Sequence, residues 1–240
     1  DPSNFNGSIV LGRPEAQSIT ASLTTPKQTA LYLEWGAVSG TYTQKSQEKA
    51  SSATSPAVIV MDGLEANTAY YYHVVFKPEG AADYSISNEY TFQTARASGT
   101  GYNFVIQSDS HLLNKADPAL YTKSMQMMAG LEPDFICDLG DTFLNDQKTG
   151  ALTQSYANVV KTVTQQLPYF DIVTRSAPLF LTIGNHEGEY GAYLDGTADN
   201  LAAKSTKART TFFPNPVPDS FYSGNTQTDP VCGLPQDYYA

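Results

Sequence analysis

Residues 178–187 read Pro-Leu-Phe-Leu-Thr-Ile-Gly-Asn-His-Glu and carry the strongest structural signal in the sequence. The first six residues are mostly apolar, which predicts a short buried strand. The four that follow include an amide, an imidazole and a carboxylate. Two earlier apolar runs end in a similar way, at Asp109-Ser110-His111 and at Gly140-Asp141. Because open α/β sheets form their sites at the carboxyl ends of parallel strands, these three strand ends predict one functional site.

The sequence around these strand ends alternates between strand and helix patterns. We expect the following elements: strands at 102–107, 133–139 and 178–183, and helices at 118–129 and 156–167. Asp117 before Pro118 predicts the start of the first helix, and Pro168 predicts the end of the second. The strand segments are apolar on both faces, which predicts a parallel sheet covered by helices on both sides.

The N-terminal part of the chain has a different pattern. Short runs of alternating apolar and polar residues are separated by Gly, Pro, Ser and Asn over residues 8–94. This pattern predicts an antiparallel β-sandwich with Trp35 in its core. Leu64, a turn and Tyr70 have the spacing of a tyrosine corner. His73 lies in the strand that follows, and we interpret it as a strand residue rather than a metal ligand.

The change of pattern predicts two domains. We expect a β-sandwich at residues 1–95, a linker at 96–101, where the apolar periodicity is lost, and an α/β domain at 102–240. Near the C-terminus we expect a helix at 201–208. Residues 236–240 look like the opening of a strand that the sequence does not complete, so the α/β domain is expected to be incomplete.

The composition excludes some classes of function. Hydrophobic residues make up 41% and charged residues 16% of the chain, which is typical of a β-rich, often extracellular protein. The net charge of −10 and the lack of a Lys/Arg cluster exclude a basic nucleic-acid-binding patch, and no apolar run is long enough for a transmembrane segment. Because the sequence begins with Asp1, we expect that a signal segment has been removed or that the sequence starts late, and we predict a secreted or cell-surface protein. Cys137 and Cys232 do not form a disulfide framework, and Cys137 is expected to be a buried thiol.

The three strand ends carry ligands that hard and borderline metal ions prefer. Asp109 and His111 can turn toward one ion if the chain leaves extended geometry between them. Asp141 is suited to bridge two ions, and Asn185 offers a neutral oxygen to the second. Two adjacent ions can hold a phosphoester and activate a water, and His186 would then act on the substrate as phosphate stabiliser or proton donor.

In this order, the three blocks resemble the first three motifs of the calcineurin-like metallophosphoesterase superfamily. The predicted sandwich resembles the fibronectin type III domain that precedes the catalytic domain in purple acid phosphatases and related secreted phosphoesterases. The resemblance implies a metal-dependent hydrolase with two divalent or trivalent ions (Zn, Mn, Fe or Ca). It implies metal ligands at Asp109, His111, Asp141 and Asn185. It further implies catalytic roles for Asp141 and His186, and for Glu187 a supporting role behind the ligands.

At two positions the residue differs from the one found in purple acid phosphatases. Those enzymes have an iron-binding tyrosine three residues after the bridging aspartate, where this sequence has Leu144, and they usually have glycine where this sequence has His111. The resemblance therefore implies a protein that is not purple and whose metals need not include iron(III).

The number of histidines differs more strongly from what the family has. The family continues with motifs that supply three more histidines, whereas this sequence has only His73, His111 and His186. The second metal would keep only Asn185 and Asp141, which are too few for a tight site. If this chain binds two metals, other carboxylates must replace the missing histidines, and the candidates are Asp138, Asp146 and Glu189.

Three hypotheses remain open. The chain is the N-terminal part of a phosphoesterase, whose remaining segment or another chain covers an otherwise open sheet. Alternatively, it is a non-catalytic metal- or phosphate-binding surface protein, or a structural or adhesive module of an extracellular assembly. A half-built domain would expose a large apolar face. Arg209 is interpreted as a solvated residue rather than a phosphate ligand.

Overall fold

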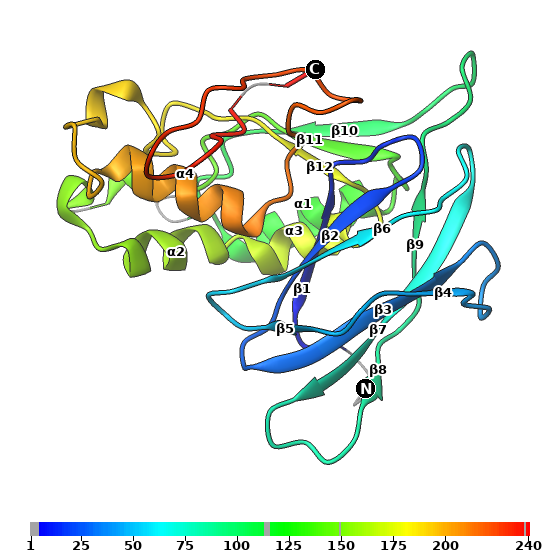
Figure 1. Ribbon diagram of the computed structural model, residues 1–240. Helices are drawn as coiled ribbons and strands as arrows, with labels where there is room; N and C mark the ends of the chain where they lie inside the picture. Colours follow the sequence, from blue (N-terminus) through cyan, green and yellow to red (C-terminus); the bar gives the residue numbers. More distant parts are fainter. Residues whose placement is uncertain (1–4, 113–115, 149, 238) are drawn as a thin grey trace.

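A computed structural model describes residues 5–112, 116–148, 150–237 and 239–240 (Figure 1). The strands are β1 (Ser8–Gly12), β2 (Ile19–Thr24), β3 (Thr29–Gly36), β4 (Gln44–Lys45), β5 (Lys49–Ser51), β6 (Ala57–Met61), β7 (Ala69–Pro78), β8 (Ser85–Ile86), β9 (Tyr90–Gln93), β10 (Phe104–Gln107), β11 (Phe135–Asp138) and β12 (Leu179–Leu181). The α-helices are α1 (Pro118–Ala129), α2 (Tyr156–Thr164), α3 (Leu167–Thr174) and α4 (Leu201–Phe212). Short 3-10 helices are η1 (Asn145–Gln147), η2 (Ala151–Thr153) and η3 (Gly191–Tyr193). In the described part of the chain, no helix is both long and apolar enough to cross a bilayer.

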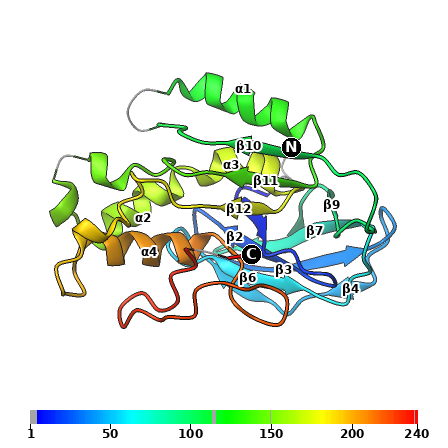
Figure 2. The ribbon, with the colours of Figure 1, turned by 90° about the horizontal axis from the view of Figure 1, so that it is seen from above.

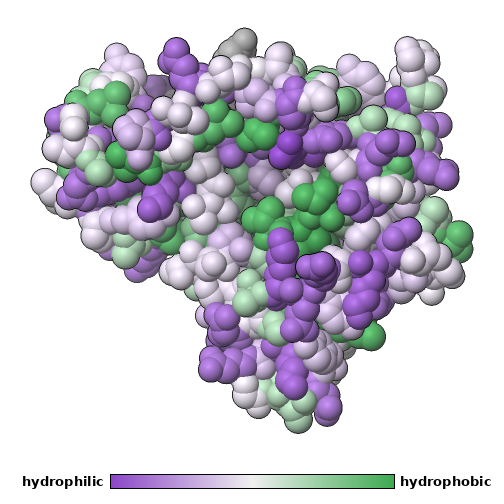
Figure 3. Space-filling model, viewed as in Figure 1, coloured by the Kyte–Doolittle hydropathy of each residue, from purple (hydrophilic) through white to green (hydrophobic). Residues whose placement is uncertain are grey.

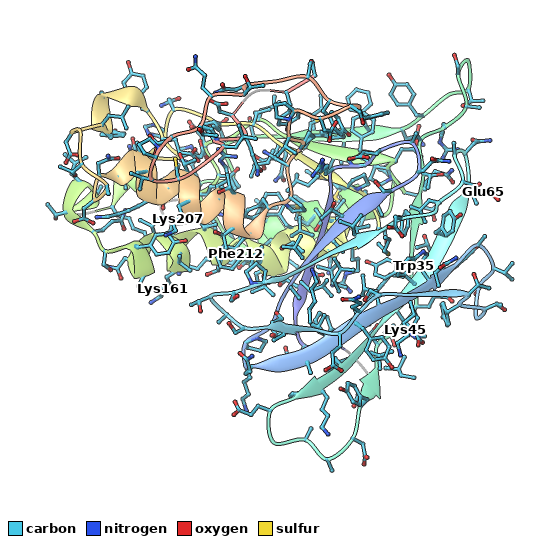
Figure 4. The ribbon with its side chains drawn as sticks, in the orientation of Figure 1. Trp35, Lys45, Glu65, Lys161, Lys207 and Phe212 are labelled. Carbon is cyan, nitrogen blue, oxygen red and sulfur yellow. The ribbon has the colours of Figure 1, made fainter. Side chains whose placement is uncertain are left out.

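The N-terminal strands form the predicted β-sandwich. Strands β1, β2 and β6 are adjacent in one sheet, and β4, β3, β7 and β8 form the other, with β5 paired to β3 and β9 paired to β7. Trp35 is buried in the core between the sheets (Figure 4). The Tyr70 hydroxyl accepts a hydrogen bond from the Glu65 backbone N–H at 2.9 Å, as a tyrosine corner requires. His73 lies in β7 and contacts Glu34, as expected of a strand residue.

The α/β part has the three predicted parallel strands. Strand β11 lies between β10 and β12, and all three run in the same direction. The first helix also begins as predicted, because the Asp117 side chain accepts a hydrogen bond from the Ala119 backbone N–H and Pro118 occupies the first turn. The carboxyl ends of β10, β11 and β12 therefore lie together at one edge of the sheet.

Strand β1 joins the two parts into one sheet. It pairs antiparallel with β2 and parallel with β12, so the sheet runs β10-β11-β12-β1-β2-β6. Its alternating side chains enter two cores: Ile9 lies in the sandwich core and Val10 packs against the helices of the α/β part. The Asp171 carboxylate in α3 accepts a hydrogen bond from the Ile9 N–H at 2.8 Å. Residues 96–101 connect β9 to β10 without regular secondary structure, and the division into domains remains a prediction.

The helices differ from the expected boundaries in two places. The expected helix at 156–167 is two helices, because α3 begins at Leu167 and includes Pro168 in its first turn. A proline is tolerated there, since the first backbone N–H groups of a helix have no partner within the helix. The expected helix at 201–208 continues to Phe212, where the chain enters a proline-rich segment.

Helices cover one face of the β10–β12 sheet rather than both. Figures 1 and 2 show α1 and α3 on one side of these strands and the C-terminal segment on the other. The prediction of helices on both sides is wrong for the described residues, because the apolar side chains of the second face meet irregular chain instead. Phe104 is 46% and Ile106 53% exposed on that face.

The second face has a groove of about 700 Å³. Its lining is mainly apolar and includes Phe135, Cys137, Phe180 and Tyr239. Cys137 is therefore only partly buried, contrary to expectation. The expected final strand forms only an isolated bridge between Gly224 and Tyr239, with residue 238 outside the described residues. Most of the surface in Figure 3 is hydrophilic, and apolar residues gather in the hollow where the two parts meet. That further polypeptide covers the apolar second face of the β10–β12 sheet stays a prediction.

Candidate active site

Three candidate ligands meet at the carboxyl ends of β10 and β11. Asp109, His111 and Asp141 each offer one ligand atom, and these atoms lie within 4.8 Å of one another. His111 Nε2 is 3.4 Å from Asp109 Oδ1. Hydrogen bonding from the Ser108 side chain is the largest of the effects that lower the pKa of Asp109 and keep this carboxylate ionised. Two carboxylates and one imidazole form a donor set that suits Zn, Mn or Fe.

The backbone leaves extended geometry at each of these residues. Asp109, His111 and Asp141 have φ angles of 54°, 46° and 55°, in the left-handed region that favours glycine. Such conformations cost of order 1 kcal/mol or more per residue, and they cluster at functional sites. Here they turn residues that follow two neighbouring strands toward a common point.

Two glycines allow the second and third blocks to approach. A Cβ added at Gly140 would lie 2.1 Å from the Gly184 backbone nitrogen, and one added at Gly184 would lie 2.3 Å from Asp141 Oδ1. Gly140 also has a φ of 94°. Neither position therefore has room for a side chain. The close contact places the turn after β12 directly against the candidate ligand Asp141.

Glu187 supports the turn that carries Asp141. Its fully buried carboxylate accepts hydrogen bonds from the backbone N–H groups of Asp141 (3.0 Å), Thr142 (2.6 Å) and Phe143 (3.3 Å). Burial raises the pKa of Glu187, and these hydrogen bonds oppose that shift. Glu187 therefore fixes the backbone of the turn that carries Asp141.

His186 and Asn185 lie on the neighbouring turn. The His186 backbone N–H donates to Asp141 Oδ1 at 2.8 Å, and the Asn185 side chain is exposed. The His186 ring contacts Asp146, with 2.9 Å between Nδ1 and Oδ2. This hydrogen bond is the main cause of the raised pKa of His186. The structure thus brings the third block beside the ligand cluster, and the assignment of individual roles remains a proposal.

The three carboxylates considered as replacement ligands are engaged elsewhere. Asp138 is fully buried and accepts hydrogen bonds from Gln107, Gly140 and Thr142. Asp146 contacts His186, and Glu189 forms an ion pair with Arg209. None of the three belongs to the ligand cluster among the described residues.

Arg209 differs from its interpretation as a solvated residue. Its side chain is 1% exposed, and its Nε and Nη2 lie 2.7 and 2.9 Å from the two carboxylate oxygens of Glu189. It also donates to the backbone carbonyls of Pro235 and Gln236. Sequence position could not reveal this burial, because the partners come from the loop after His186 and from the C-terminal segment. Arg209 holds these two segments together.

Asp138 gives the folded protein a pH dependence. Burial is the main cause that raises the pKa of Asp138 from 3.8 to about 6. Between these values the folded state holds a proton that the unfolded state has lost, so the free energy of unfolding falls as pH rises. The loss amounts to about 3 kcal/mol and is complete above pH 6.

Asp138→Asn should remove this part of the pH dependence. Asparagine keeps the acceptor oxygen for Gly140 and Thr142, and a rotated Gln107 amide can accept from its NH₂ group. Urea unfolding at a series of pH values should show the variant gaining about 3 kcal/mol relative to wild type from acid to neutral pH. Parallel profiles for the two proteins would contradict the assignment.

Two solved phosphatases have similar structures. A purple acid phosphatase isolated from yellow lupin (Lupinus luteus) seeds matches 90% of this chain with a TM-score of 0.59 and 16% sequence identity. PhoD matches 91% with a TM-score of 0.56 and 14% identity. The chain has the fold of these two phosphatases. The expected architecture, a β-sandwich followed by an α/β domain, is confirmed.

The match covers only part of each phosphatase. This chain spans 42% of the lupin enzyme and 49% of PhoD, which agrees with the expectation of an incomplete α/β domain. A fibronectin type III domain of human collagen alpha-1(XX) also matches 41% of the chain, with 23% identity and a TM-score of 0.29. No protein-family model matches the sequence, and no match was found among the curated proteins.

Proposed function

We propose that the protein is a metal-dependent hydrolase of phosphoesters. The observation that carries the proposal is the convergence of Asp109, His111 and Asp141, whose ligand atoms lie within 4.8 Å of one another. The fold shared with two phosphatases supports it. Phosphoesters are therefore the proposed substrate class.

The donor set fits one catalytic metal ion. Asp109, His111 and Asp141 provide three protein ligands, and catalytic sites commonly combine three protein ligands with an open position. A divalent ion there supplies Lewis acidity toward phosphoryl oxygens and makes water a stronger nucleophile near neutral pH. For a second ion, the proposed ligands from this chain are Asp141 and Asn185.

His186 is the proposed catalytic residue beside the metal ligands. Its backbone is fixed by the hydrogen bond to Asp141, and its ring is held on the Nδ1 side by Asp146. When the ring carries a proton on both nitrogens, Nε2 can donate a hydrogen bond to a phosphoryl oxygen or a proton to the leaving oxygen.

Further polypeptide is the proposed partner of the second sheet face. Phe104 and Ile106 are about half exposed there, and both phosphatases with this fold are more than twice as long as the segment that matches. An apolar face of this kind is typical of an interaction site. We propose that a further segment of the protein or another chain covers it.

Secretion or display at the cell surface is proposed from the composition.

Metal titration and ester hydrolysis test the proposed function. Calorimetric titration with Mn²⁺ or Zn²⁺ should show metal binding, and an aryl phosphate monoester or diester should be hydrolysed only with metal present. Metal binding without turnover of either ester would favour a non-catalytic metal-binding protein. No metal binding would favour a structural or adhesive module.

His186→Ala should separate catalysis from metal binding. We expect turnover to fall by about 100-fold or more, because a positioned proton donor contributes at least that much. Metal content should stay unchanged, since the variant keeps Asp109, His111 and Asp141. His73→Ala, in the sandwich, is the matched control and should change neither quantity. Loss of metal from the His186 variant would make His186 a ligand instead.

A further inference from the structure

Gln166 is a buried glutamine at the junction of α2 and α3. Its side chain is fully buried, and its Nε2 donates a hydrogen bond to the Thr142 backbone carbonyl at 2.8 Å. Thr142 directly follows Asp141, the candidate ligand in the turn after β11. The hydrogen bond therefore joins a helix junction outside the ligand cluster to the turn that carries one of the ligands.

The local helices do not explain why this side chain is a glutamine. Gln166 is the N-cap residue of α3, but its side chain makes no capping hydrogen bond there. Burying an amide costs free energy unless the amide is hydrogen-bonded, and Gln166 Oε1 has no hydrogen-bond partner among the described residues. An apolar side chain at this junction would avoid that cost. The hydrogen bond to Thr142 is therefore what the amide contributes.

The peptide group between Thr142 and Phe143 is held from both sides. Its N–H donates to Glu187 Oε1 at 3.3 Å, and its carbonyl accepts from Gln166. Glu187 also accepts from the backbone N–H groups of Asp141 and Thr142. Glu187 thus binds donors of the turn, whereas Gln166 binds an acceptor. A rotation of this peptide group would break contacts with both side chains.

The turn needs such support because of its backbone conformation. Asp141 and Leu144 have φ angles of 55° and 51°, in the left-handed region that favours glycine. Such conformations persist where the surrounding contacts fix them. Without Gln166, the buried Thr142 carbonyl loses this donor, and the turn can relax toward water. That relaxation would displace the Asp141 carboxylate from the other two candidate ligands.

We propose that Gln166 is a positioning residue, which holds the turn after β11 so that the Asp141 carboxylate stays beside Asp109 and His111. The inference rests on the proposed function for the metal ion that these three side chains would bind. The hydrogen bond and its effect on the turn can be measured without that ion.

Gln166→Met removes the donor and keeps an unbranched side chain. In the metal-free variant, the amides of residues 141–143 should exchange with solvent about 10-fold faster than in wild type, because a buried carbonyl has lost its partner. The amides of β3 in the same variant provide the reference for global unfolding. Calorimetric titration should show Mn²⁺ or Zn²⁺ binding weakened by about 10-fold or more, as for other residues that support ligands.

Thr174→Val is the matched control. Thr174 lies in α3 and is fully buried, and its hydroxyl donates to the Ile9 backbone carbonyl at 2.8 Å. The substitution removes the same kind of hydrogen bond from the same helix, but its partner belongs to β1 rather than to the turn. Urea unfolding should show a loss of stability in both variants, whereas only Gln166→Met should change metal affinity. Equal losses of metal affinity would overturn the inference, and so would unchanged exchange at residues 141–143 in Gln166→Met.

The wild-type protein supplies a measurement that does not depend on the folding of a variant. NMR should show slow exchange of the Gln166 side-chain NH₂ protons and a scalar coupling from Nε2 to the Thr142 carbonyl carbon. Zn²⁺ should shift these signals and leave those of the exposed Gln44 in β4 unchanged. Zn²⁺ saturation without a shift at Gln166 would overturn the inference. If no Zn²⁺ binds, the proposed function fails, whereas exchange at residues 141–143 still decides whether Gln166 holds the turn.

Discussion

Asp141→Asn is expected to weaken metal binding by more than about 100-fold and to leave no measurable metal-dependent hydrolysis. The expected loss exceeds the 10- to 100-fold effects of residues that only support ligands, because a negatively charged ligand becomes a neutral amide. The variant keeps an oxygen that can accept the hydrogen bond from the His186 backbone N–H. The local fold should therefore persist while the ligand set is lost.

Asp62→Asn provides the control for this change. Asp62 is an exposed carboxylate that follows β6 in the sandwich, and the same substitution there should alter neither metal affinity nor turnover. Calorimetric titration of both variants with Mn²⁺ or Zn²⁺ measures the difference directly. Equal affinities for the two variants would show that Asp141 is not a metal ligand.

Local sequence signals predicted much of the α/β part. Apolar runs located β10, β11 and β12, and Asp117 with Pro118 located the start of α1. These elements follow from residue periodicity and from helix capping, both of which act over a few residues. The rule for the carboxyl ends of parallel strands placed the candidate ligands at one edge of the sheet, and the structure brings Asp109, His111 and Asp141 together there.

Features that depend on distant contacts could not be predicted in this way. The pairing of β1 with β12 joins Gly12 to Leu179, and only the folded chain shows that Ile9 and Val10 face different cores. Asp146 was considered only as a metal ligand, because a residue in a 3-10 helix has no periodic signal that reveals its contact with His186. The apolar residues of the strands predicted that the second face of the sheet is apolar, but they did not predict which segment covers that face.

Arg209→Met is expected to lower the free energy of unfolding by about 3–5 kcal/mol, because it leaves Glu189 as an unpaired buried carboxylate. The Glu189 side chain is 5% exposed. The Thr206 hydroxyl would remain its hydrogen-bond donor at 2.8 Å, but a hydroxyl does not neutralise the charge. The carbonyls of Pro235 and Gln236 would lose their donor as well, so the C-terminal segment should detach more readily.

A double variant separates the cost of the isolated charge from the value of the ion pair. Replacing Glu189 and Arg209 together by methionine should recover most of the lost stability, since apolar residues can replace a buried ion pair at little cost. Lys45→Met is the control for an exposed pair: Lys45 is 55% exposed and lies 3.8 Å from Glu34, and its loss should cost at most about 1 kcal/mol. Urea unfolding of the three variants measures these differences. If Arg209→Met lowers the free energy of unfolding as little as Lys45→Met does, water must reach Glu189 in the variant. The Arg209–Glu189 ion pair could then not be the contact that fixes the C-terminal segment beside the candidate active site.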